Sequence, residues 1–291
     1  MSQLAFKEQV LARLSKLRPA EQRVMTFVIE NREEALMGSA SSLAEKAGTS
    51  DATVIRAVKA LGFTGMEALR RALADDMRAD LSPSNRLART LSEVGDDLTS
   101  AFEVTLDTHQ KSLERLRTDI SPEQFKKTVD YIISAQRTHI FGIGPSSAMA
   151  SYFSAQLARF GFAAASLAQT GLLLADQLLG IQKGDVLLMF AYGRIYPELA
   201  TLLRRAKTQN IPVILFSDSL GPQLGGQVDV SLAVPRGTAD MLSMHTATLG
   251  LIEALLVGIA KAQPQKTLAS LELLNELRAD LVGQRMDIPT S

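Results

Sequence analysis

Residues 42–61 read SLAEKAGTSDATVIRAVKAL, and their pattern determines how the N-terminal part of the chain is expected to fold. Apolar side chains recur at helical spacing on both sides of Gly48, and glycine suits the left-handed end of a helix. The pattern predicts a short helix opened by a capping box at residues 42–45, a tight turn, and a second helix that is capped by Ser50 and ended by Gly62. Two helices joined in this way have helix-turn-helix geometry.

The second of these predicted helices presents a polar face. Its apolar positions can be buried in the angle between the helices, which leaves its polar positions on the outside. In helix-turn-helix proteins the first residues of such a helix enter the major groove of DNA. An arginine there can contact guanine or a phosphate, a lysine can contact a phosphate, and hydroxyl groups can reach either. We therefore predict a DNA-binding face made of Ser50, Asp51, Thr53, Arg56 and Lys59, with Ala57 on the same side and Arg70 and Arg71 as further backbone contacts.

A second interpretation stays open on spacing alone, namely an ordinary helical pair with solvated charges. The net charge weighs mildly against DNA binding, because the chain has 31 basic and 31 acidic residues, whereas DNA-binding domains often show a basic excess. A small DNA-binding domain attached to a larger neutral domain would hide its charge in this average. The distribution of charge therefore matters more than its sum.

The composition restricts the class and compartment of the protein. A chain of 291 residues with 46% hydrophobic residues is long enough for one large domain or two ordinary ones. The sequence has no cysteine, which excludes disulfides and thiolate metal sites and fits the reducing cytoplasm. Residues 1–10 lack the apolar core of a signal peptide, and apolar runs such as 186–192 are far shorter than the ~20 residues of a membrane span. We expect a cytoplasmic protein without contact to a membrane.

The histidines do not indicate a metal site. His109, His139 and His245 are widely separated and lack the spacing of metal ligands. Each is expected to be structural or exposed, and neither a metal ion nor a cofactor is predicted.

The hydrophobic pattern differs between parts of the chain and divides it into segments. Residues 1–78 are patterned with a helical period throughout, so they are predicted to form an all-α helix-turn-helix domain. Residues 79–121 begin with a break at 81–85 and continue with helical spacing from Leu87 to Leu116, which predicts a linker and a connecting helix that packs on the second domain or on a partner subunit. Residues 122–265 form the second domain, and residues 266–291 form a C-terminal helix and tail.

The second domain alternates apolar strands with helices. Strands are expected at 138–143, 163–168, 186–191, 213–217 and 228–234, a long helix at 239–262, and a tail helix at 267–282. Apolar strands separated by helices favour a parallel sheet that is covered on both faces. The predicted fold class of this domain is therefore α/β, with a five-stranded parallel sheet sandwiched by helices in a flavodoxin-like or Rossmann-like arrangement.

The stretch GIGPSS at residues 142–147 lies where the first strand gives way to a helix. Glycines let the backbone approach an anion, and the start of a helix offers unpaired N–H groups and a positive dipole end. Ser146 and Ser147 add hydroxyl donors. A dinucleotide site would need a third glycine near Ala148 or Met149, so that interpretation is disfavoured.

The N-terminal motifs resemble those of a known family. The segments SLAEKAGTSDATVIR at 42–56, LGFTG at 61–65 and LRPAEQRV at 17–24 closely resemble the N-terminal domain of the RpiR/MurR family of bacterial transcriptional regulators. The resemblance covers about the first 78 residues. It implies a homodimer or tetramer that reads palindromic operators, often beside sugar or amino-sugar catabolic genes.

The resemblance extends to the second domain, which looks like a SIS (sugar isomerase) domain that binds phosphosugars and dimerises. Its first phosphate-contacting serine would fall on Ser146. Its second motif, Ser-x-Ser-Gly-x-Thr, falls on FAYGRI at residues 190–195, where only Gly193 agrees. An anion could instead be held by the guanidinium of Arg194, with the hydroxyls of Tyr192 and Tyr196 nearby. The predicted effector-binding residues are Gly144, Ser146, Ser147, Tyr192, Gly193 and Arg194, and Asp218 and Ser219 follow a strand at the same ligand-binding edge or serve only as turn residues.

These observations predict a transcription regulator that binds double-stranded DNA and senses a phosphosugar, a sugar acid or a related carbohydrate derivative. The sensing domains would pair through the helices at 147–160 and 239–262 and through the tail, and the effector would alter the spacing of two recognition helices. Because the phosphate motif is altered, another small metabolite or no ligand at all also fits the sequence. The protein is not expected to be an enzyme. The alternative is a phosphosugar isomerase with Glu253 or His245 as general base, although an isomerase would have no use for the first 78 residues.

Overall fold

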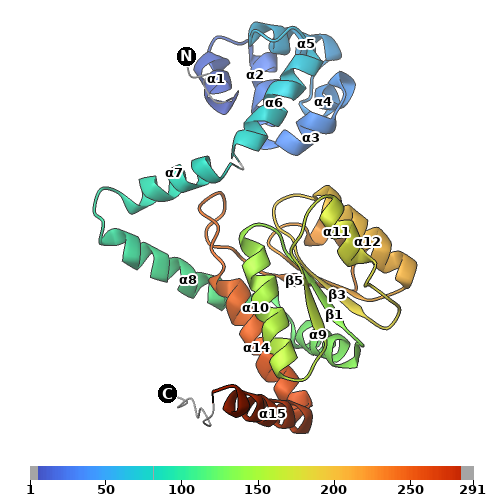
Figure 1. Ribbon diagram of the computed structural model, residues 1–291. Coiled ribbons are helices and arrows are strands. Elements are labelled where there is room, and N and C mark those ends of the chain that lie inside the picture. The colour runs from blue at the N-terminus through green and yellow to red at the C-terminus, as the bar shows by residue number, and fades with distance from the viewer. Residues whose placement is uncertain (1–5, 81, 283–291) are drawn as a thin grey trace. The chain divides into compact units, whose positions relative to one another are not determined.

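The computed structural model describes residues 6–80 and 82–282 and is drawn in Figure 1. The chain divides into two compact units, of which one ends at Thr90 and the other begins at Leu91. Each unit has a hydrophobic core of its own. The predicted break at 81–85 starts at Leu81, which lies outside the described residues.

Short helices around one apolar cluster build the N-terminal unit. They are α1 (Phe6–Leu14), α2 (Pro19–Glu30), α3 (Arg32–Met37), α4 (Ala40–Lys46), α5 (Asp51–Ala60) and α6 (Met66–Asp80), and α7 (Pro83–Val94) crosses into the second unit. Val28, Leu43, Val54 and Leu69 come from four different helices and are completely buried in this cluster. Helices this short are marginal in isolation, so their stability depends on this shared burial.

The start of the helix-turn-helix differs from the prediction. Helix α4 begins at Ala40, and its cap is Ser39, whose hydroxyl accepts the N–H of Ser42 at 3.1 Å. The capping box predicted at residues 42–45 is therefore wrong, because the extended backbone of Gly38 ends the unpredicted helix α3 and brings the next cap forward. The second helix agrees with the prediction, since the Ser50 hydroxyl accepts the N–H of Thr53.

A parallel five-stranded sheet forms the centre of the C-terminal unit and confirms the predicted fold class. Its strands are β1 (Thr138–Phe141), β2 (Ala164–Leu167), β3 (Val186–Phe190), β4 (Val213–Ser217) and β5 (Val230–Ala233), in the order β2-β1-β3-β4-β5. Strand β1 pairs on both sides, so Ile140 lies opposite Ser166 of β2 and Leu188 of β3. This strand order is the flavodoxin-like one, in which the chain reverses direction across the sheet beside β1.

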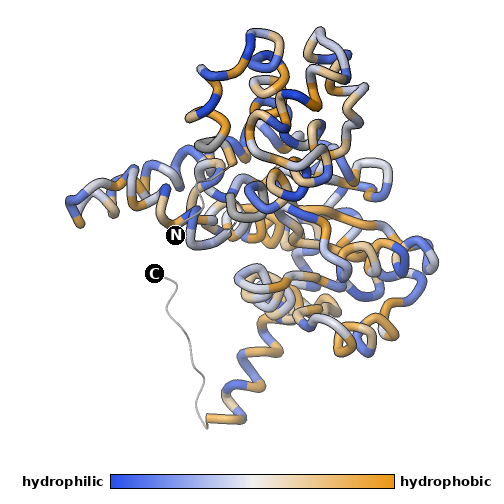
Figure 2. The backbone as a smooth tube through the Cα atoms, turned by 90° about the horizontal axis from the view of Figure 1, so that it is seen from above, coloured by the Kyte–Doolittle hydropathy of each residue, from blue (hydrophilic) through white to orange (hydrophobic). Residues whose placement is uncertain are grey.

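Helices cover both faces of the sheet. They are α8 (Ser100–Asp119), α9 (Pro122–Ser134), α10 (Pro145–Arg159), α11 (Leu172–Leu178), α12 (Pro197–Gln209), α13 (Gly221–Leu224), α14 (Thr246–Ala262) and α15 (Pro264–Val282). One core contains Ile140 and Phe216 of the sheet with residues of α9, α10 and α14, and the other contains Phe141 and Leu215 with residues of α11 and α12. The strand segments are accordingly coloured mostly as hydrophobic in Figure 2.

Two predicted helices differ in extent from the observed ones. The helix expected from Leu87 to Leu116 is split into α7 and α8, because Gly95 leaves α7 with a positive φ of 76°. The long helix expected at 239–262 begins only at Thr246, and the residues before it form a loop. In this loop Gly237 and Asp240 have positive φ values of 89° and 61°, and the N–H of Met244 donates to the carbonyl of Arg236.

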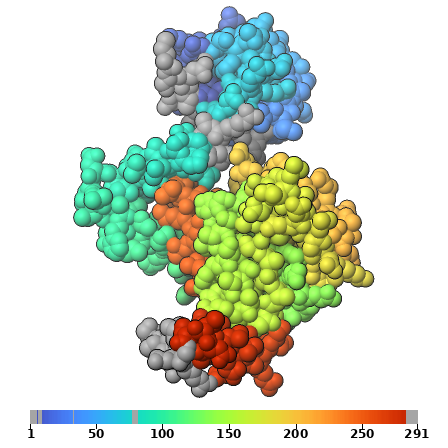
Figure 3. Space-filling model, viewed as in Figure 1, coloured from blue at the N-terminus to red at the C-terminus, as the bar shows by residue number. Residues whose placement is uncertain are grey.

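Helices α8 and α15 lie on the outside of the C-terminal unit. Helix α8 packs against α14 and β5, and α15 packs against α10 and α14. Figure 3 shows α10, α14 and α15 together on one face of this unit. No helix of the described residues combines the length and the hydrophobicity of a membrane span, and α14 and α15 reach them only as a pair bent by 107°.

Candidate DNA-binding face and candidate effector site

The structure places most of the predicted DNA-binding residues on the outside of α5. Ser50, Asp51, Arg56 and Lys59 are exposed. Thr53 and Ala57, which were expected on the same outer face, are buried at 6% and 0% exposure. They turn inward because the helical repeat brings them next to Val54 and Val58, which pack in the core of the unit.

The buried Thr53 nevertheless takes part in the arrangement of the face. Its Oγ1 lies 3.0 Å from the Ser50 Oγ and accepts a hydrogen bond from Nη2 of Arg56 at 2.9 Å. On its other side, Nε of Arg56 lies 3.8 Å from a carboxylate oxygen of Glu21 on α2. Glu21 also accepts the backbone N–H of Arg18 at 3.0 Å, which fixes its position at the start of α2. The arginine predicted to contact DNA is thus held by contacts to two helices.

Other cations near the helix-turn-helix have structural contacts. Arg23 of α2 donates to the carbonyl of Gly48 in the turn at 3.4 Å. Arg70 donates to the carbonyl of Gly38 and so joins α6 to the start of α4. Arg71 is exposed and pairs with Glu67 one helical turn away at 3.6 Å. Arg23 was not among the predicted residues, and its place beside the turn could not be inferred before the packing of α2 was known.

The junction of β1 and α10 carries three of the predicted effector-binding residues. A Cβ at Gly142 would lie 2.5 Å from the carbonyl oxygen of Ser146, so this position has room only for glycine. Gly144 precedes α10 with a φ of 57° and supplies no side-chain cap to the first turn of the helix. Ser146 is buried at 6% exposure, and the hydroxyl of Ser147 donates to the carbonyl of Gly144 at 2.7 Å. The turn thus directs the start of a fifteen-residue helix towards the carboxyl ends of the strands.

The segment after β3 carries the other three. Tyr192 is 8% exposed, and its hydroxyl lies 3.1 Å from Oγ1 of Thr248 on α14. Burial raises the pKa of Tyr192, so its hydroxyl stays protonated. Gly193 turns the chain with a φ of 73°, and the exposed Arg194 stacks on the ring of Tyr196 at 4.6 Å. The tyrosine hydroxyl expected to meet a ligand is therefore engaged with α14, whereas Arg194 faces outward.

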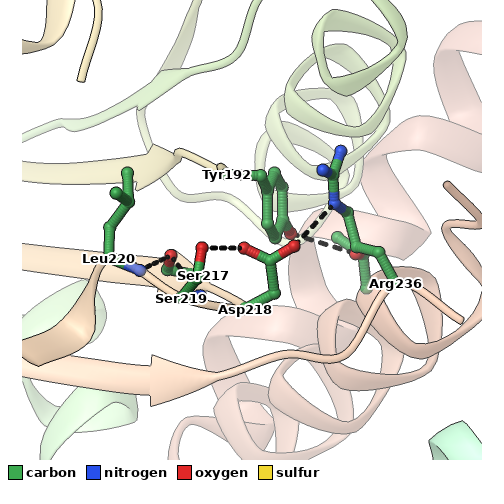
Figure 4. Close-up of polar contacts among 7 residues, drawn as sticks. Tyr192, Ser217, Asp218, Ser219, Leu220 and Arg236 are labelled. Atoms are coloured by element: carbon green, nitrogen blue, oxygen red, sulfur yellow. Dashed lines mark hydrogen bonds and ion pairs between the residues drawn. The ribbon is translucent and has the colours of Figure 1, made fainter. Parts of the chain in front are cut away.

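A second arginine at this end of the sheet was missed. The guanidinium carbon of Arg236, which follows β5, lies 4.2 Å above the centre of the Tyr192 ring. Its Nε lies 3.4 Å from a carboxylate oxygen of Asp218, and Asp218 accepts a hydrogen bond from the Ser219 hydroxyl at 2.8 Å (Figure 4). The available signal was an arginine directly after the last parallel strand, at the edge where open sheets bind ligands.

The two residues considered as a general base have other surroundings. His245 lies edge-on to Tyr192 with ring centroids 6.2 Å apart, and its Nδ1 is buried without a hydrogen-bond partner among the described residues. Burial, and secondarily the positive charge of Arg236, lower the pKa of His245. Glu253 is exposed on α14 and accepts a hydrogen bond from the Tyr152 hydroxyl at 3.4 Å. No group of His, Cys, Asp and Glu side chains suited to holding a metal ion occurs in the described part of the chain.

The remaining histidines have structural contacts. His139 of β1 is 2% exposed and bonds through Nε2 to Asp185, which precedes β3, at 2.9 Å. Nε2 of His109 on α8 lies 3.2 Å from Oγ1 of Thr246, the first residue of α14. The second contact joins α8 to the end of the loop that begins at Arg236.

Family models match both units. Residues 5–80 match the helix-turn-helix domain of the rpiR family, and residues 131–258 match the SIS domain. The HTH-type transcriptional regulator HexR of Pseudomonas aeruginosa is 26% identical over 230 residues, which cover 78% of each chain. The bifunctional protein glk of Burkholderia thailandensis is 27% identical over 271 residues, but this chain spans only 41% of its length.

Solved structures share the fold. The Vibrio vulnificus NanR protein complexed with ManNAc-6P superposes with a TM-score of 0.59 at 22% identity, covering 94% of this chain and 100% of that one. The sugar isomerase domain of an RpiR transcription factor from Sphaerobacter thermophilus superposes with a TM-score of 0.55 at 21% identity, covering 60% of this chain and 97% of that one. With an rpiR-type helix-turn-helix domain followed by a SIS domain, the chain belongs to the RpiR family of transcriptional regulators.

Proposed function

We propose that this protein regulates transcription by binding an operator through α5 and by sensing an anionic carbohydrate derivative, a phosphosugar or a sugar acid, at the carboxyl ends of the strands. The observation that carries the proposal is the combination of an rpiR-type helix-turn-helix with a sheet edge where Arg194, Arg236 and the start of α10 offer positive charge. An isomerase would need a base poised at that edge, whereas Glu253 is exposed and bonded to Tyr152 and His245 lies edge-on against the Tyr192 ring with its Nδ1 buried.

The DNA-binding part of the proposal rests on the surface of α5. Ser50, Asp51, Arg56 and Lys59 lie on its exposed side, where the first turns of a recognition helix meet base edges and phosphates. Thr53 supports this face through its bond to Arg56. We therefore assign base contact to Arg56 and phosphate contact to Lys59.

The effector part of the proposal rests on chemistry rather than on the family motif. The serines and the threonine of the usual phosphate loop are absent from residues 190–195. In this proposal the guanidinium groups of arginine side chains donate the hydrogen bonds that those hydroxyls would have donated. Ser146, on which the first serine of the family motif falls, lies at the start of α10 beside Ser147. A sugar phosphate is bound to NanR, and we extend that compound class, not the compound, to this chain.

We further propose that the protein is cytoplasmic and that it forms a dimer or tetramer, because two recognition helices at a fixed spacing read a palindromic site. Helix α15 supports this arrangement with exposed apolar side chains beside α10 and α14. They are Leu268, Leu273, Leu277 and Leu281, at 66%, 54%, 51% and 85% exposure. Sedimentation of the wild type and of a Leu273→Asp, Leu277→Asp variant tests the proposal: the wild type should sediment as a dimer or tetramer, and the variant should dissociate.

The function is tested in two steps with the full chain. Selection from random duplex DNA should enrich an inverted repeat, and failure to enrich any sequence would remove the DNA-binding part. Thermal unfolding is then followed with glucose, glucose 6-phosphate, gluconate and 6-phosphogluconate, since a ligand of the native state must raise the midpoint. A shift with the anionic compounds and none with glucose supports an anionic effector. An Arg194→Ala variant should lose part of the thermal shift that the anionic compounds produce.

A further inference from the structure

The guanidinium of Arg236 is held in place from two directions. It lies over the Tyr192 ring, with the guanidinium carbon 4.2 Å from the ring centre, and its Nε lies 3.4 Å from a carboxylate oxygen of Asp218. Asp218 is itself held by the Ser219 hydroxyl. Tyr192 cannot move away easily, because it is buried and its hydroxyl is bonded to Thr248. An arginine held in this way has lost most of its rotamer freedom before any ligand binds.

The same guanidinium lacks partners for its remaining donors. Figure 4 shows the two terminal nitrogens of Arg236 directed away from the Asp218 carboxylate. Among the described residues, no hydrogen bond engages these terminal nitrogens, although the side chain is only 15% exposed. A cation removed this far from water is costly unless an anion pairs with it. Its partners are one long contact to a carboxylate that is itself 28% exposed and the face of the Tyr192 ring.

Neighbouring groups do not supply that anion. His245 lies against the same tyrosine ring, and its lowered pKa makes it a neutral neighbour. The hydroxyl of Tyr192 stays protonated because of its burial. The end of the guanidinium that points away from Asp218 therefore offers two parallel N–H donors to an oxyanion from outside the chain.

We infer that Arg236 is a specificity-determining residue that binds an oxyanion of the effector, a phosphate or a carboxylate, through its two terminal nitrogens, while Tyr192 and Asp218 position it. The inference rests on the proposed function, because it concerns the same sheet edge. It goes beyond the altered family motif, since Arg236 follows β5 and lies outside the loops after β1 and β3. A neutral sugar would leave these donors unpaired and would bind poorly.

The test compares Arg236→Lys with the wild type, using glucose 6-phosphate, gluconate and inorganic phosphate as probes in isothermal titration. Lysine keeps the charge but loses the planar pair of donors, so the dissociation constant for the anionic probe that binds the wild type should rise roughly tenfold. Arg204→Lys is the matched control, because Arg204 is exposed on α12 and, among the described residues, its side chain bonds only to Thr201 of its own helix. Its affinity should equal that of the wild type.

The outcomes separate this inference from the proposed function. Equal affinity of Arg236→Lys and the wild type overturns the role of Arg236 and leaves the anionic effector in place. A wild type that binds none of the three probes overturns both. If Arg236→Lys unfolds at a lower temperature, Arg236→Gln is measured as well: it keeps a planar amide and loses the charge, and an unchanged affinity in that variant also contradicts the inference.

Discussion

Glu21 of α2 and Arg56 of α5 form a pair across two helices, with a carboxylate oxygen 3.8 Å from Nε of the arginine. The side chain of Glu21 is 9% exposed and that of Arg56 is 55% exposed, so the buried partner holds the exposed one. Thr53 holds the same arginine through Nη2 at 2.9 Å. The side chain expected to meet DNA thus has its conformation restricted in advance, which reduces the entropy lost on binding.

Glu21→Gln should weaken operator binding roughly fivefold, the equivalent of about 1 kcal/mol of side-chain ordering. Glutamine at this position still accepts the N–H of Arg18 as part of a capping box, so the fold and the melting temperature should stay unchanged. Fluorescence anisotropy with a labelled operator measures the effect. In an Arg56→Ala background the same substitution should have no further effect. An increase in affinity would instead show that Glu21 merely repels DNA.

Arg56→Ala should reduce operator affinity by roughly tenfold to a hundredfold, since a bidentate contact to guanine is worth about 1–3 kcal/mol. Its side chain is half exposed, so circular dichroism and the melting temperature should match the wild type. Lys59→Ala should give a smaller loss that is equal for all sequences and should lower the salt dependence by about one phosphate contact. Normal binding by Arg56→Ala would show that α5 is not the recognition helix.

Gly142→Ala should destabilise the C-terminal unit by about 1–3 kcal/mol. Its Cβ would meet the backbone carbonyl of Ser146 at 2.5 Å, and a backbone atom cannot rotate away. The turn before α10 would then move, and the thermal shift with anionic sugars should disappear. Gly226→Ala is the control, because nothing lies within 4 Å of the added atom and its φ is not positive. Equal melting temperatures for the two variants would contradict this account of the turn.

Stability should fall as the pH is lowered below about 6.5, the ordinary pKa of histidine. Burial lowers the pKa of His139 more than the bond to Asp185 raises it, and His245 is shifted in the same direction. A lowered pKa means that the unfolded chain binds more protons than the native one, so the stabilisation is complete above the unfolded pKa and is lost below it. The melting temperature should decrease as the pH is lowered from 8 to 5, and it should decrease less steeply in the His245→Gln variant than in the wild type. A constant melting temperature across this range would contradict the lowered pKa values of His139 and His245.

Local patterns were sufficient to predict much of the fold. The strands are mostly apolar, β3 completely so, and they are separated by helices, so a parallel sheet covered on both faces was the arrangement that could bury them. The family motifs gave the two domain types. The error at 239–262 arose because residues 239–245 contain no glycine or proline that would mark a break, and the positive φ of Asp240, a residue other than glycine, could not be inferred from the pattern.

The residues of the candidate effector site could be predicted from the sequence only in part. The glycines and serines at 142–147 follow a motif, and they could be placed before the structure was known. Arg236 and Tyr192 are 44 positions apart, and their stacking depends on how β3 and β5 lie in the sheet. Likewise, the burial of Thr53 depends on the angle at which α5 packs, which spacing alone does not determine.

Helix α8 makes the sensing unit larger than the sheet and its immediate helices. His109 and Thr246 join it to the start of α14, and Leu113 packs so closely on Gly250 that an added Cβ would lie 3.0 Å away. A chimera that joins this sensing unit to another DNA-binding domain should therefore be fused within residues 95–99, so that α8 is kept. A cut at Pro122, where the sequence pattern places the start of the sheet domain, would remove α8. The apolar face of α14 that packs on Leu113 would then be exposed to solvent, and the loop that begins at Arg236 would lose the contact between His109 and Thr246. The useful module of this protein begins one helix earlier than its sequence pattern indicates.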